Sequence, residues 1–487
     1  MEKGQAYKQL FIGGDLSGIQ KFLYNISSRK AAVSLKGRSY YLKRFMENVC
    51  ETIVVETEKA GAEKTRVIYC SGGKFYLLSD YSAKITQAID QCARQAKADL
   101  WKEHRGQLGI SISYVPFNEN TDGTIECNGL SRQKPGYLWK QVSAEFNRQK
   151  KQKFKDILTD NFSDFFEPIA VGGKPRICAV TGIESPDCVE LEPESDEEEK
   201  MYVLPSVKEQ IEQGKKLNRE QHFKGFEAFT GNKYLGVLRM DVDGLGKRFV
   251  EGFDSIRQYK EFSDRLVAFF EKSIERLQQE QVFKDDINII YAGGDDLFIV
   301  GQWDKVIDFA ELIRQETVRL FAKDNISISG GIAIVKPKFP IAKAAELAGE
   351  AEDKAKQFRN GEKNAFHLLG KTVSWDKEFE YVKNYKQQFV GLHKKYDMSK
   401  SILHKLMLYS AIADQNVVRR REGKAEDFSY IWHLSYYLTR YINRYKSPEI
   451  KDFCKNLRDQ ELDYRHGRNL ELIALAARWA ELSLKDE

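Results

Sequence analysis

Four carboxylates at two places in the chain could together carry out a reaction. Asp241 and Asp243 stand in the sequence MDVDG, at the end of an apolar stretch that predicts a β-strand. Side chains two residues apart share one face of a strand, so both carboxylates are expected to project the same way. Asp295 and Asp296 follow a Gly pair in the sequence GGDD, which indicates a hairpin tip. If that hairpin pairs beside the first strand, all four carboxylates meet at one sheet edge.

Clustered carboxylates point to a metal-dependent reaction. Like charges this close are costly unless a cation lies between them, and Mg²⁺ or Mn²⁺ prefers a few carboxylates together with phosphate oxygens. Two such ions can activate a hydroxyl group and stabilise a leaving pyrophosphate in an in-line displacement. A lone GGDD is also consistent with an ordinary turn, because Gly and Asp are common in turns. The Asp pair at the matching position of the same unit favours the metal site.

Two further features could contact a phosphate. Gly244 and Gly246 follow the Asp pair and would leave backbone N–H groups free at the start of a helix. Lys354 and Lys356 lie on a predicted helix after the last strand of this region, where one of them could meet a triphosphate. Each signal is weak alone, because a lysine on a helix is more often solvated surface than ligand.

An internal repeat positions these residues. The segments LFIGGDLSGIQKFL at residues 10–23 and LGVLRMDVDGLGKRFV at residues 235–250 both run from an apolar strand into an Asp, then a Ser or Asp, then a Gly. A second apolar strand follows in each copy and breaks at a Gly pair, at residues 72–73 and 293–294. In this alignment Asp15, Ser17 and Gly18 correspond to Asp241, Asp243 and Gly244.

Each copy predicts the element order β-α-β-β-α-β. Helix-length patterns cover residues 41–60 and 83–104 in the first copy and 259–280 and 303–322 in the second, and the last strands cover 109–117 and 326–335. This order is the ferredoxin-like arrangement, which is also the palm of many nucleotide polymerases and cyclases. The predicted fold class is α+β, with two tandem ferredoxin-like palm domains, an inserted linker domain and a C-terminal α-helical bundle.

The first copy lacks the acidic residues of the second. Lys74 and Phe75 follow its Gly pair, and Ser17 stands in the place of Asp243. We therefore expect the first copy to hold no pair of metal ions and not to catalyse. A degenerate palm beside a complete one predicts a pseudo-symmetric pocket, in which the first palm binds a second nucleotide through Ser17 and Gly18.

Four domains are predicted along the chain: a degenerate palm over residues 1–120, a linker domain over 121–222, a catalytic palm over 223–374 and a helical bundle over 375–487. The linker holds an acidic run, ELEPESDEEEK, at residues 190–200, and a basic stretch. The basic residues are Arg148, Lys150, Lys151, Lys153 and Lys155. The segment from Tyr381 to Glu487 carries 20 Lys and Arg against 14 Asp and Glu, so nucleic acid contact is an alternative to plain solvated surface there.

The composition fits a folded globular chain. The 487 residues are 42% hydrophobic and 31% charged, with only 10 Pro. No apolar run approaches the roughly 18 residues of a membrane span, and residues 1–10 do not form a signal peptide, so a cytoplasmic location is expected. The seven cysteines are odd in number and scattered, which predicts reduced thiols rather than a disulfide framework.

Four motifs together resemble one known family. They are GGDLSGIQKFLY, LKGRSYYL, MDVDGLGK and YAGGDDLFIVG. In this order they resemble the large polymerase-cyclase subunit of type III CRISPR effector complexes, in a form without the N-terminal HD nuclease domain, and the resemblance covers essentially the whole chain. The GGDD alone is also similar to the GGEEF hairpin of diguanylate cyclases, but the DLSGIQ and LKGRS segments are not features of that group.

The resemblance implies a nucleotidyltransferase that joins ATP through 3′-5′ phosphodiester bonds into cyclic oligoadenylate messengers. Its catalytic residues would be Asp241, Asp295 and Asp296, and its Mg²⁺ or Mn²⁺ would be bound by Asp241, Val242, Asp243, Asp295 and Asp296. The nucleotide would contact Ser17, Gly18, Gly244, Gly246, Gly293, Gly294 and Lys356. The implied partners are a guide RNA, a target RNA that turns synthesis on, small helical subunits docked on the helical bundle, and repeat-forming backbone subunits.

Two departures from the family pattern are visible. Many members begin with an HD-type nuclease domain that cuts single-stranded DNA, but this chain starts almost at the first palm strand and contains no His-Asp dipeptide, so DNA cleavage is not expected. The inserted domain of the family often carries a four-cysteine zinc site with a C-x-x-C-G step. Here the matching stretch is CAVTG, with Thr181 in place of the second ligand, and only Cys178, Cys188 and the distant Cys127 remain. Fewer than four thiolates argue against structural zinc.

Two other functions stay open. The same metal site could join AMP to another acceptor, such as S-adenosylmethionine, because the residues that choose the acceptor cannot be read from the sequence. The chain could instead be chiefly a scaffold that holds the end of the guide RNA and the partner subunits. A pure scaffold has no use for four converging carboxylates, which favours the enzyme.

Overall fold

A computed structural model describes residues 7–26, 30–160, 162, 175–192, 200–221, 226, 234–461 and 468–486. The chain divides into two compact units. The larger unit contains the residues up to Ser327 together with Val335–Leu347, and the smaller unit contains Ile328–Ile334 and the residues from Ala348 onwards. These units do not coincide with the four predicted domains. The boundaries after residues 120 and 374 stay predictions, and the boundary after residue 222 lies outside the described residues.

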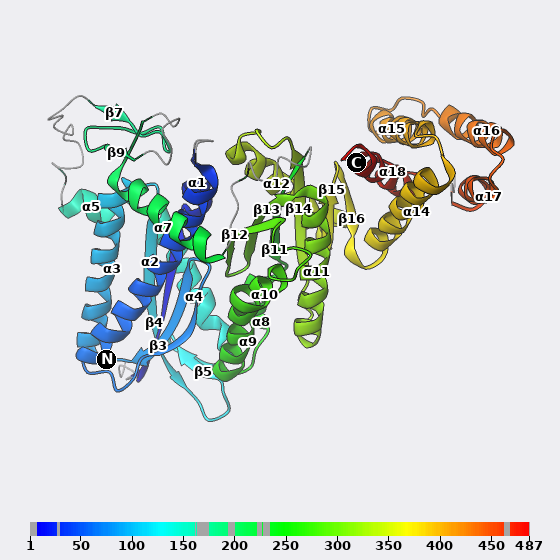
Figure 1. The fold of residues 1–487 in the computed structure, drawn as a ribbon. Helices are drawn as coiled ribbons and strands as arrows, with labels where there is room; N and C mark the ends of the chain where they lie inside the picture. The colour runs from blue at the N-terminus through cyan, green and yellow to red at the C-terminus, as the bar shows by residue number, and fades with distance from the viewer. Residues whose placement is uncertain are drawn as a thin grey trace. The chain divides into compact units, whose positions relative to one another are not determined.

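The first sheet follows the predicted order β-α-β-β-α-β (Figure 1). Its elements are β1 (Gln9–Ser17), α1 (Ile19–Tyr24), α2 (Ala31–Lys59), β2 (Arg66–Ser71), β3 (Lys74–Asp80), α3 (Ala83–His104) and β4 (Gly109–Glu119). Two short strands, β5 (Ile125–Cys127) and β6 (Leu130–Gln133), extend the sheet. The strand order is β2-β3-β1-β4-β5-β6, and neighbouring strands are antiparallel. We call β1 to β4 with their helices the first palm.

Side chains of β1 alternate between the two faces of the sheet, and the apolar ones on one face contribute to the core of the first palm. Leu10, Ile12 and Leu16 share one face of the strand and are buried with residues of α2 and α3. The predicted bounds of α3 are confirmed, and the Oγ of its N-cap Ser82 accepts a hydrogen bond from the Ile85 N–H at 3.2 Å. Helix α2 begins at residue 31 and not at residue 41, because the LKGRS segment is itself helical and packed, with Arg38 buried.

The larger unit also holds most of the second copy of the repeat. Its elements there are β11 (Leu235–Val242), α8 (Leu245–Glu251), α9 (Ile256–Ala268), a π-helical turn at Phe269–Ser273, α10 (Ile274–Gln278), β12 (Ile287–Gly293), β13 (Asp296–Gln302) and α11 (Trp303–Phe321). The strands run in the order β12-β13-β11, antiparallel throughout, which matches the order β2-β3-β1 of the first palm. The predicted duplication is therefore visible in the strand pairing, and we call this copy the second palm.

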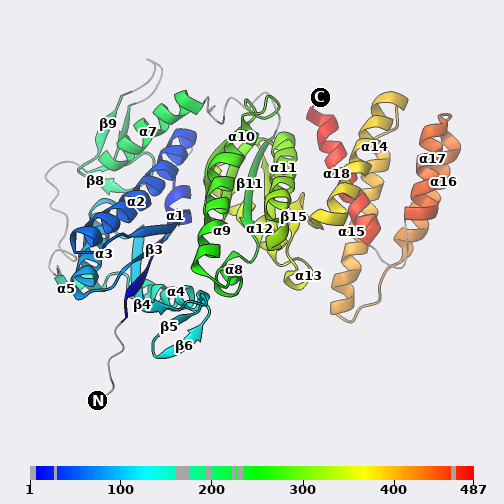
Figure 2. The ribbon, with the colours of Figure 1, turned by 90° about the horizontal axis from the view of Figure 1, so that it is seen from below.

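Helix α4 (Gly136–Lys151) covers the face of the first sheet opposite to α2 and α3 (Figure 2). A Cβ on Gly13 of β1 would lie 2.6 Å from Val142, so the missing side chain lets the helix approach the strand closely. Trp139 of α4 stacks on Tyr259 of α9, with 3.8 Å between the ring centroids. The helix that the sequence assigns to the linker thus contacts both palms.

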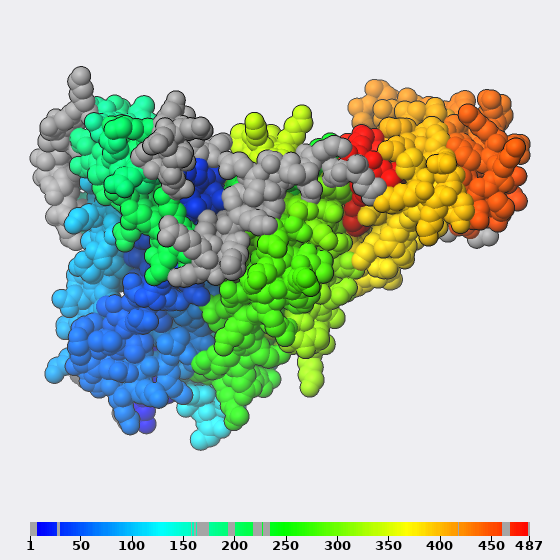
Figure 3. Space-filling model, in the orientation of Figure 1, coloured from blue at the N-terminus to red at the C-terminus, as the bar shows by residue number. Residues whose placement is uncertain are grey.

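The remainder of the predicted linker contains α5 (Lys155–Asp160), β7 (Arg176–Ile177), β8 (Glu184–Ser185), β9 (Val189–Leu191), β10 (Met201–Val203) and α7 (Pro205–Gln221). Of these elements, α7 packs on α2. Figure 3 shows the green surface of α7 directly against the blue surface of the first palm. A Cβ on Gly37 of α2 would lie only 1.8 Å from the Gln210 carbonyl oxygen of α7, so the two helices cross at a glycine. Residues 193–199 of the predicted acidic run lie outside the described residues.

The smaller unit is mainly helical. It holds most of β14 (Ile328–Val335), which pairs parallel with β15 (Ala365–Leu368), while β15 pairs antiparallel with β16 (Lys371–Ser374). Helix α12 (Ile341–Lys356) enters it from the larger unit, and a short helical segment, α13 (Phe358–Gly361), follows. In the described part of the predicted helical tail, five α-helices follow: α14 (Glu380–Tyr396), α15 (Ser401–Arg421), α16 (Ser429–Arg444), α17 (Pro448–Asn456) and α18 (Arg468–Asp486). None of the described helices is long and apolar enough to cross a membrane.

Candidate active site

Three carboxylates meet at the hairpin of the second palm. In the register between β11 and β13, Asp241 is directly opposite Asp296, and Asp295 precedes Asp296 in the turn. The carboxylate oxygens of Asp241, Asp295 and Asp296 lie within 4.8 Å of one another, and all three residues are partly exposed. In the part of the chain that the structure describes, this is the one group of three or more His, Cys, Asp or Glu side chains with such spacing.

The backbone of the hairpin explains why these side chains converge. Gly294 has a φ of +72°, which a residue with a Cβ adopts only at a cost, and it turns the chain between β12 and β13. The Val242 N–H donates a hydrogen bond to the Asp295 carbonyl oxygen at 3.1 Å. This bond ties the end of β11 to the turn and holds the three carboxylates at one sheet edge.

Asp243 lies apart from the three. Strand β11 ends at Val242, so the rule that places residues two apart on one face no longer applies at Asp243. Its Oδ2 accepts a hydrogen bond from the Ser327 Oγ at 2.7 Å, and its N–H donates to the Ser327 carbonyl oxygen at 2.9 Å. The structure therefore brings three of the four predicted carboxylates together and directs the fourth to Ser327.

The chemistry of the three carboxylates fits a divalent cation. Three partly exposed negative charges this close repel one another, and oxygen ligands of this kind suit Mg²⁺ or Mn²⁺ with further ligands from water or phosphate. The space beside them is open: a Cβ on Gly244 or on Gly246 would meet nothing within 4 Å. The two glycines leave room for a ligand in front of α8.

The hairpins of the two palms pack tip to tip. A Cβ on Gly294 would lie 2.8 Å from the Gly72 Cα, and a Cβ on Gly293 would lie 3.4 Å from the Gly72 nitrogen. The Gly294 N–H donates a hydrogen bond to the Ser71 Oγ at 3.1 Å. The predicted pairing of a degenerate palm with a complete one is thus a direct backbone contact between their Gly pairs.

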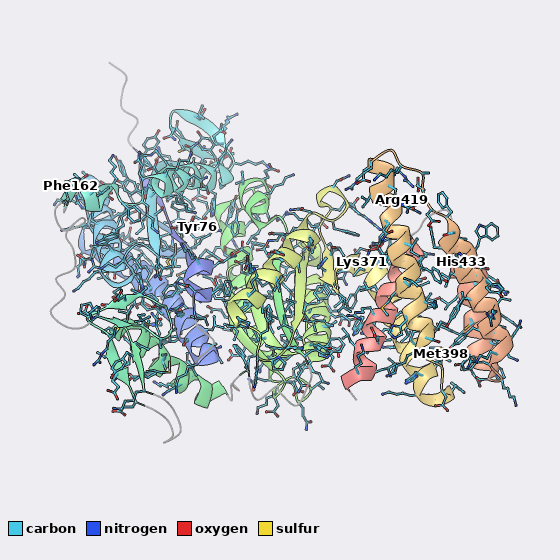
Figure 4. All side chains as sticks on the ribbon, turned by 90° about the horizontal axis from the view of Figure 1, so that it is seen from above. Tyr76, Phe162, Lys371, Met398, Arg419 and His433 are labelled. Atoms are coloured by element: carbon cyan, nitrogen blue, oxygen red, sulfur yellow. The ribbon has the colours of Figure 1, made fainter. Side chains whose placement is uncertain are left out.

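The hydroxyl groups of Tyr69 and Tyr291 lie beside this contact, and these tyrosines were not among the predicted site residues. Burial raises the pKa of Tyr69, and the charge of Asp295 raises it further. Burial likewise raises the pKa of Tyr76, on β3 of the first palm (Figure 4), with smaller contributions from Asp15 and Asp295. Tyr291 of β12 is affected in the same direction by burial, Asp296 and Asp295. The sequence offers a weak signal, because a tyrosine precedes each Gly pair, Tyr69 by three residues and Tyr291 by two.

A cavity of about 470 Å³ opens between the two palms. It extends from α2 and the tip of the first hairpin to β12 and α10, and its lining includes Lys36, Ser39, Lys43, Arg44, Gly72, Gly73, Glu275 and Gly293. The Lys36 Nζ donates a hydrogen bond to the Ile289 carbonyl oxygen at 2.9 Å. Burial lowers the pKa of Lys36 to about 8, against an opposing effect of Glu275 and with a further lowering by Lys43. Lys43 pairs with Glu271 and Arg44 with Glu47, each at 2.8 Å, and both carboxylates line the same cavity, so its wall carries charges of both signs.

The remaining predicted contact residues have structural partners. The Ser17 Oγ donates a hydrogen bond to the Gly109 carbonyl oxygen at 3.0 Å. Gly18 has a φ of +92°, and a Cβ there would lie 2.2 Å from the Gln107 carbonyl oxygen. Lys356 is in the smaller unit, where its Nζ lies 2.6 Å from Glu352 Oε1. The structure thus gives each of the three a local role, and their contact with a nucleotide stays a prediction.

The cysteines of the inserted segment are free thiols. Cys178 and Cys188 are buried, and the Cys188 Sγ donates a hydrogen bond to the Arg176 carbonyl oxygen at 3.3 Å. Cys127 is buried in β5. Thr181 lies in the turn after Cys178, and its Oγ accepts a hydrogen bond from the Ile183 N–H at 3.3 Å. Cys178 and Cys188 thus offer two thiols where a structural zinc site of this kind takes four ligands.

Comparison with known proteins identifies two regions of the chain. Residues 8–169 match a family model described as Csm1 subunit domain B, and residues 234–367 match one described as Cas10/Cmr2, second palm domain. These two ranges contain the two copies of the internal repeat.

Curated relatives match most of the chain. The chain is 27% identical over 479 residues to the "CRISPR system single-strand-specific deoxyribonuclease Cas10/Csm1 (subtype III-A)" of Enterococcus italicus, with 84% of this chain and 61% of that protein covered. It is also 27% identical to the protein of the same name from Methanocaldococcus jannaschii, with 77% and 61% covered. The chain therefore spans about 61% of the length of these relatives.

The names of these relatives conflict with one expectation. DNA cleavage was not expected because the chain contains no His-Asp dipeptide, whereas both relatives are named as deoxyribonucleases. Since the chain spans only part of their length, a dipeptide missing from this part carries no conclusion about the activity. The expectation is withdrawn.

Solved structures share the fold. A Csm1-Csm4 cassette in complex with pppApA has a TM-score of 0.69 at 18% sequence identity, covering 98% of this chain and 69% of that chain. A Csm1-Csm4 cassette in complex with cA4 has a TM-score of 0.62 at 18% identity, covering 97% and 70%. Other similar structures carry one ATP or AMPPNP. At this level of identity the likeness shows a common fold.

Proposed function

Because the chain belongs to the Cas10/Csm1 family, we propose that it is a metal-dependent nucleotidyltransferase subunit of a type III CRISPR RNA-guided complex. In this proposal it joins ATP molecules into cyclic oligoadenylates when the complex binds its target RNA. The observation that carries the proposal is the convergence of Asp241, Asp295 and Asp296 within 4.8 Å at the Gly-Gly hairpin of the second palm. Similar structures bound to ATP, pppApA and cA4 support the same choice of substrate and product.

The reaction forms one phosphodiester bond at each step. The 3′-hydroxyl oxygen of one ATP attacks the α-phosphorus of another, the bond to pyrophosphate breaks, and the hydroxyl proton passes to solvent. Bound Mg²⁺ or Mn²⁺ supplies the positive charge that makes the hydroxyl more acidic and stabilises the leaving pyrophosphate. Asp241, Asp295 and Asp296 would hold that charge, and the open space beside Gly244 and Gly246 would admit the polyphosphate.

The first palm would bind the second nucleotide. The cavity between the palms reaches both hairpin tips, and the amines of Lys36 and Lys43 line it together with the Arg44 guanidinium. Gly72 and Gly293 also line it, so a nucleotide could approach the backbone there without meeting side chains.

The partners would be those of a CRISPR ribonucleoprotein. The similar structures are Csm1-Csm4 cassettes, one of them described as part of the type III-A CRISPR-Csm interference complex. We therefore propose that this chain pairs with a Csm4-like backbone subunit and, through it, with guide and target RNA. The helical tail, α14–α18, would dock the small helical subunits.

The products formed from labelled ATP test this function. The full chain, assembled with its partners, guide RNA and target RNA, is incubated with Mg²⁺ or Mn²⁺, and the products are resolved by mass spectrometry. We expect oligoadenylates from the unchanged protein and none from the variant with Asp295→Asn and Asp296→Asn. Asp264→Asn on the exposed side of α9 is the matched control and should keep the activity. A mixed AMP conjugate would point to another acceptor. If no product forms with target RNA bound, the chain acts as a scaffold and not as a synthase.

A further inference from the structure

The two palms carry opposite charges at equivalent positions. In the second palm, Asp241 of β11 is directly opposite Asp296 of β13. In the first palm, Asp15 of β1 is directly opposite Lys74 of β3. Residues directly opposite in an antiparallel pair project from the same face of the sheet, so Lys74 occupies the register position that a carboxylate occupies in the second palm.

A second lysine reaches the same place from outside the repeat. Lys150 stands in the last turn of α4, and its Nζ lies 2.5 Å from Asp15 Oδ2. The side chain of Asp15 is 11% exposed and that of Lys150 is 37% exposed. The carboxylate is thus nearly covered, while the ammonium group remains open to solvent on one side.

Helix α4 is fixed firmly enough to present Lys150 at this point. Val142 and Phe146 of α4 lie against Gly13 of β1, at 2.6 Å and 3.0 Å from the position that a Cβ would take. Trp139 of the same helix stacks on Tyr259 of the second palm. Because α4 packs against both palms, the backbone of Lys150 has a fixed position beside Asp15.

The charge balance of the first palm resembles that of a metal-bound site. Three carboxylates converge in the second palm, and they need added cations before a polyphosphate can approach. At the equivalent place the first palm has the carboxylate of Asp15, with Lys150 and Lys74 on the same side of its sheet. An ammonium group has three N–H donors, so Lys150 can serve Asp15 and still donate to a phosphate oxygen.

This place belongs to the region shared by the two palms. Lys74, opposite Asp15, follows Gly72 and Gly73 in the chain, and Gly72 packs on Gly294, the residue before Asp295. A ligand at Asp15 would therefore lie near the carboxylates that would hold the catalytic metal.

We propose that Lys150, with Lys74, replaces the divalent cation in the first palm and binds the polyphosphate of the second nucleotide without metal. The proposal rests on the proposed function for the nature of the nucleotide. It means that the protein has two nucleotide sites of different kinds. The site at Asp241, Asp295 and Asp296 needs a divalent ion. At Asp15 the positive charge comes from the lysine side chains.

Binding of a non-hydrolysable β,γ-imido analogue of ATP to the full chain tests this proposal. Titration calorimetry in excess EDTA should show one site, and added Mn²⁺ should add a second. Lys150→Gln should weaken the EDTA-resistant site by roughly tenfold, equivalent to about 1.4 kcal/mol, because it removes a charge-assisted contact to phosphate. Lys150→Arg should retain most of the affinity. Lys151→Gln, one residue further and exposed, is the matched control and should change nothing.

Other outcomes overturn the proposal or separate it from the proposed function. No binding in EDTA, or equal binding by the unchanged protein and by Lys150→Gln, would contradict it. If Lys150→Gln lowers the melting temperature strongly, Lys74→Gln decides, because it leaves the ion pair of Asp15 and Lys150 in place and should still weaken the EDTA-resistant site. Lys150-dependent binding in a protein that makes no oligoadenylate would refute the synthase and leave the metal-free site standing.

Discussion

Gly72 of the first palm and Gly294 of the second meet backbone to backbone: a Cβ built on Gly72 would lie 2.3 Å from the Gly294 Cα. Both residues have a positive φ, +59° and +72°. The contact joins the tip of the degenerate hairpin to the turn that carries Asp295, and the bond from the Gly294 N–H to the Ser71 Oγ reinforces it. The geometry of the three carboxylates therefore depends on the first palm as well as on the second.

Replacing Gly72 by Ala should disturb both stability and catalysis. The added methyl group would force the hairpins apart and would also strain the backbone, at a combined cost of about 2–4 kcal/mol. We expect a lower melting temperature for the larger unit and reduced formation of product from ATP. Gly129→Ala is the control, because Gly129 has a φ of +75° but a Cβ there would meet nothing within 4 Å. Equal losses in both variants would show that backbone strain alone is responsible.

Asp243→Asn should affect metal binding much less than Asp241→Asn. Asp241 belongs to the group of three carboxylates, whereas Asp243 accepts a hydrogen bond from Ser327. Mn²⁺ binding measured by electron paramagnetic resonance should weaken by roughly tenfold or more for Asp241→Asn and stay near the original value for Asp243→Asn. If the two variants lose the ion equally, Asp243 is a ligand and the side chain must turn away from Ser327 when metal binds.

Much of this arrangement was predictable from the sequence, and its limits have physical reasons. The repeat fixed the order of strands and placed Asp241 opposite the GGDD hairpin, because strand periodicity and turn residues are local signals. The bond between Asp243 and Ser327 spans 84 residues, and the ion pair between Asp15 and Lys150 joins a strand to a helix outside the repeat. Such contacts depend on tertiary packing, which no local pattern encodes.

The start of α2 was missed for a related reason. The LKGRS segment is polar, so its periodicity is weak, yet Arg38 is buried and its Nη1 donates a hydrogen bond to the Phe22 carbonyl oxygen at 2.6 Å. A buried arginine of this kind appears in the sequence as an ordinary surface residue. The contact between Gly37 and α7 that completes this region also leaves no mark on the sequence pattern.

His104 should make the first palm sensitive to acid. Burial and, to a smaller extent, the nearby charge of Arg38 lower the pKa of His104 to about 4. Between pH 6.5 and 4 the unfolded chain therefore binds a proton that the folded chain does not, and stability falls as the pH is lowered through this window. His104→Phe keeps the ring contacts with Phe22 and Tyr41 and removes the titrating group.

The comparison of the two proteins by thermal unfolding checks this effect. The difference in stability between His104→Phe and the unchanged protein should move in favour of the variant by an amount on the order of 2–3 kcal/mol from pH 6.5 to pH 4. A difference that does not change with pH would show that His104 titrates as in the unfolded chain.

Glu378 should be important for the smaller unit. Its carboxylate is nearly buried and accepts hydrogen bonds from Arg468 at 2.7 and 2.9 Å and from Arg359 at 2.8 Å. Burial alone would raise the pKa of Glu378, but the bonds from Arg468 hold it below its usual range. Glu378→Gln removes the charge beside two guanidinium groups, and we expect a loss of about 2–4 kcal/mol in the stability of this unit.

The stability lost in Glu378→Gln should depend on pH. Since the folded pKa of Glu378 is depressed, its contribution is present above the unfolded pKa and disappears as the pH falls through the folded value. The difference in melting temperature between the variant and the unchanged protein should therefore shrink in acid. Glu380→Gln, at an exposed position of α14, is the control and should melt with the unchanged protein at every pH.

Pyrophosphate release coupled to phosphodiester formation tests the central claim most directly. The assembled complex with bound target RNA is given ATP and Mn²⁺, and pyrophosphate and oligoadenylate are measured in the same sample. Our account predicts equal numbers of pyrophosphate molecules and new phosphodiester bonds, and the loss of both in the variant with Asp295→Asn and Asp296→Asn. Oligoadenylate formation that survives in this variant would contradict the assignment of the three carboxylates as the catalytic metal site.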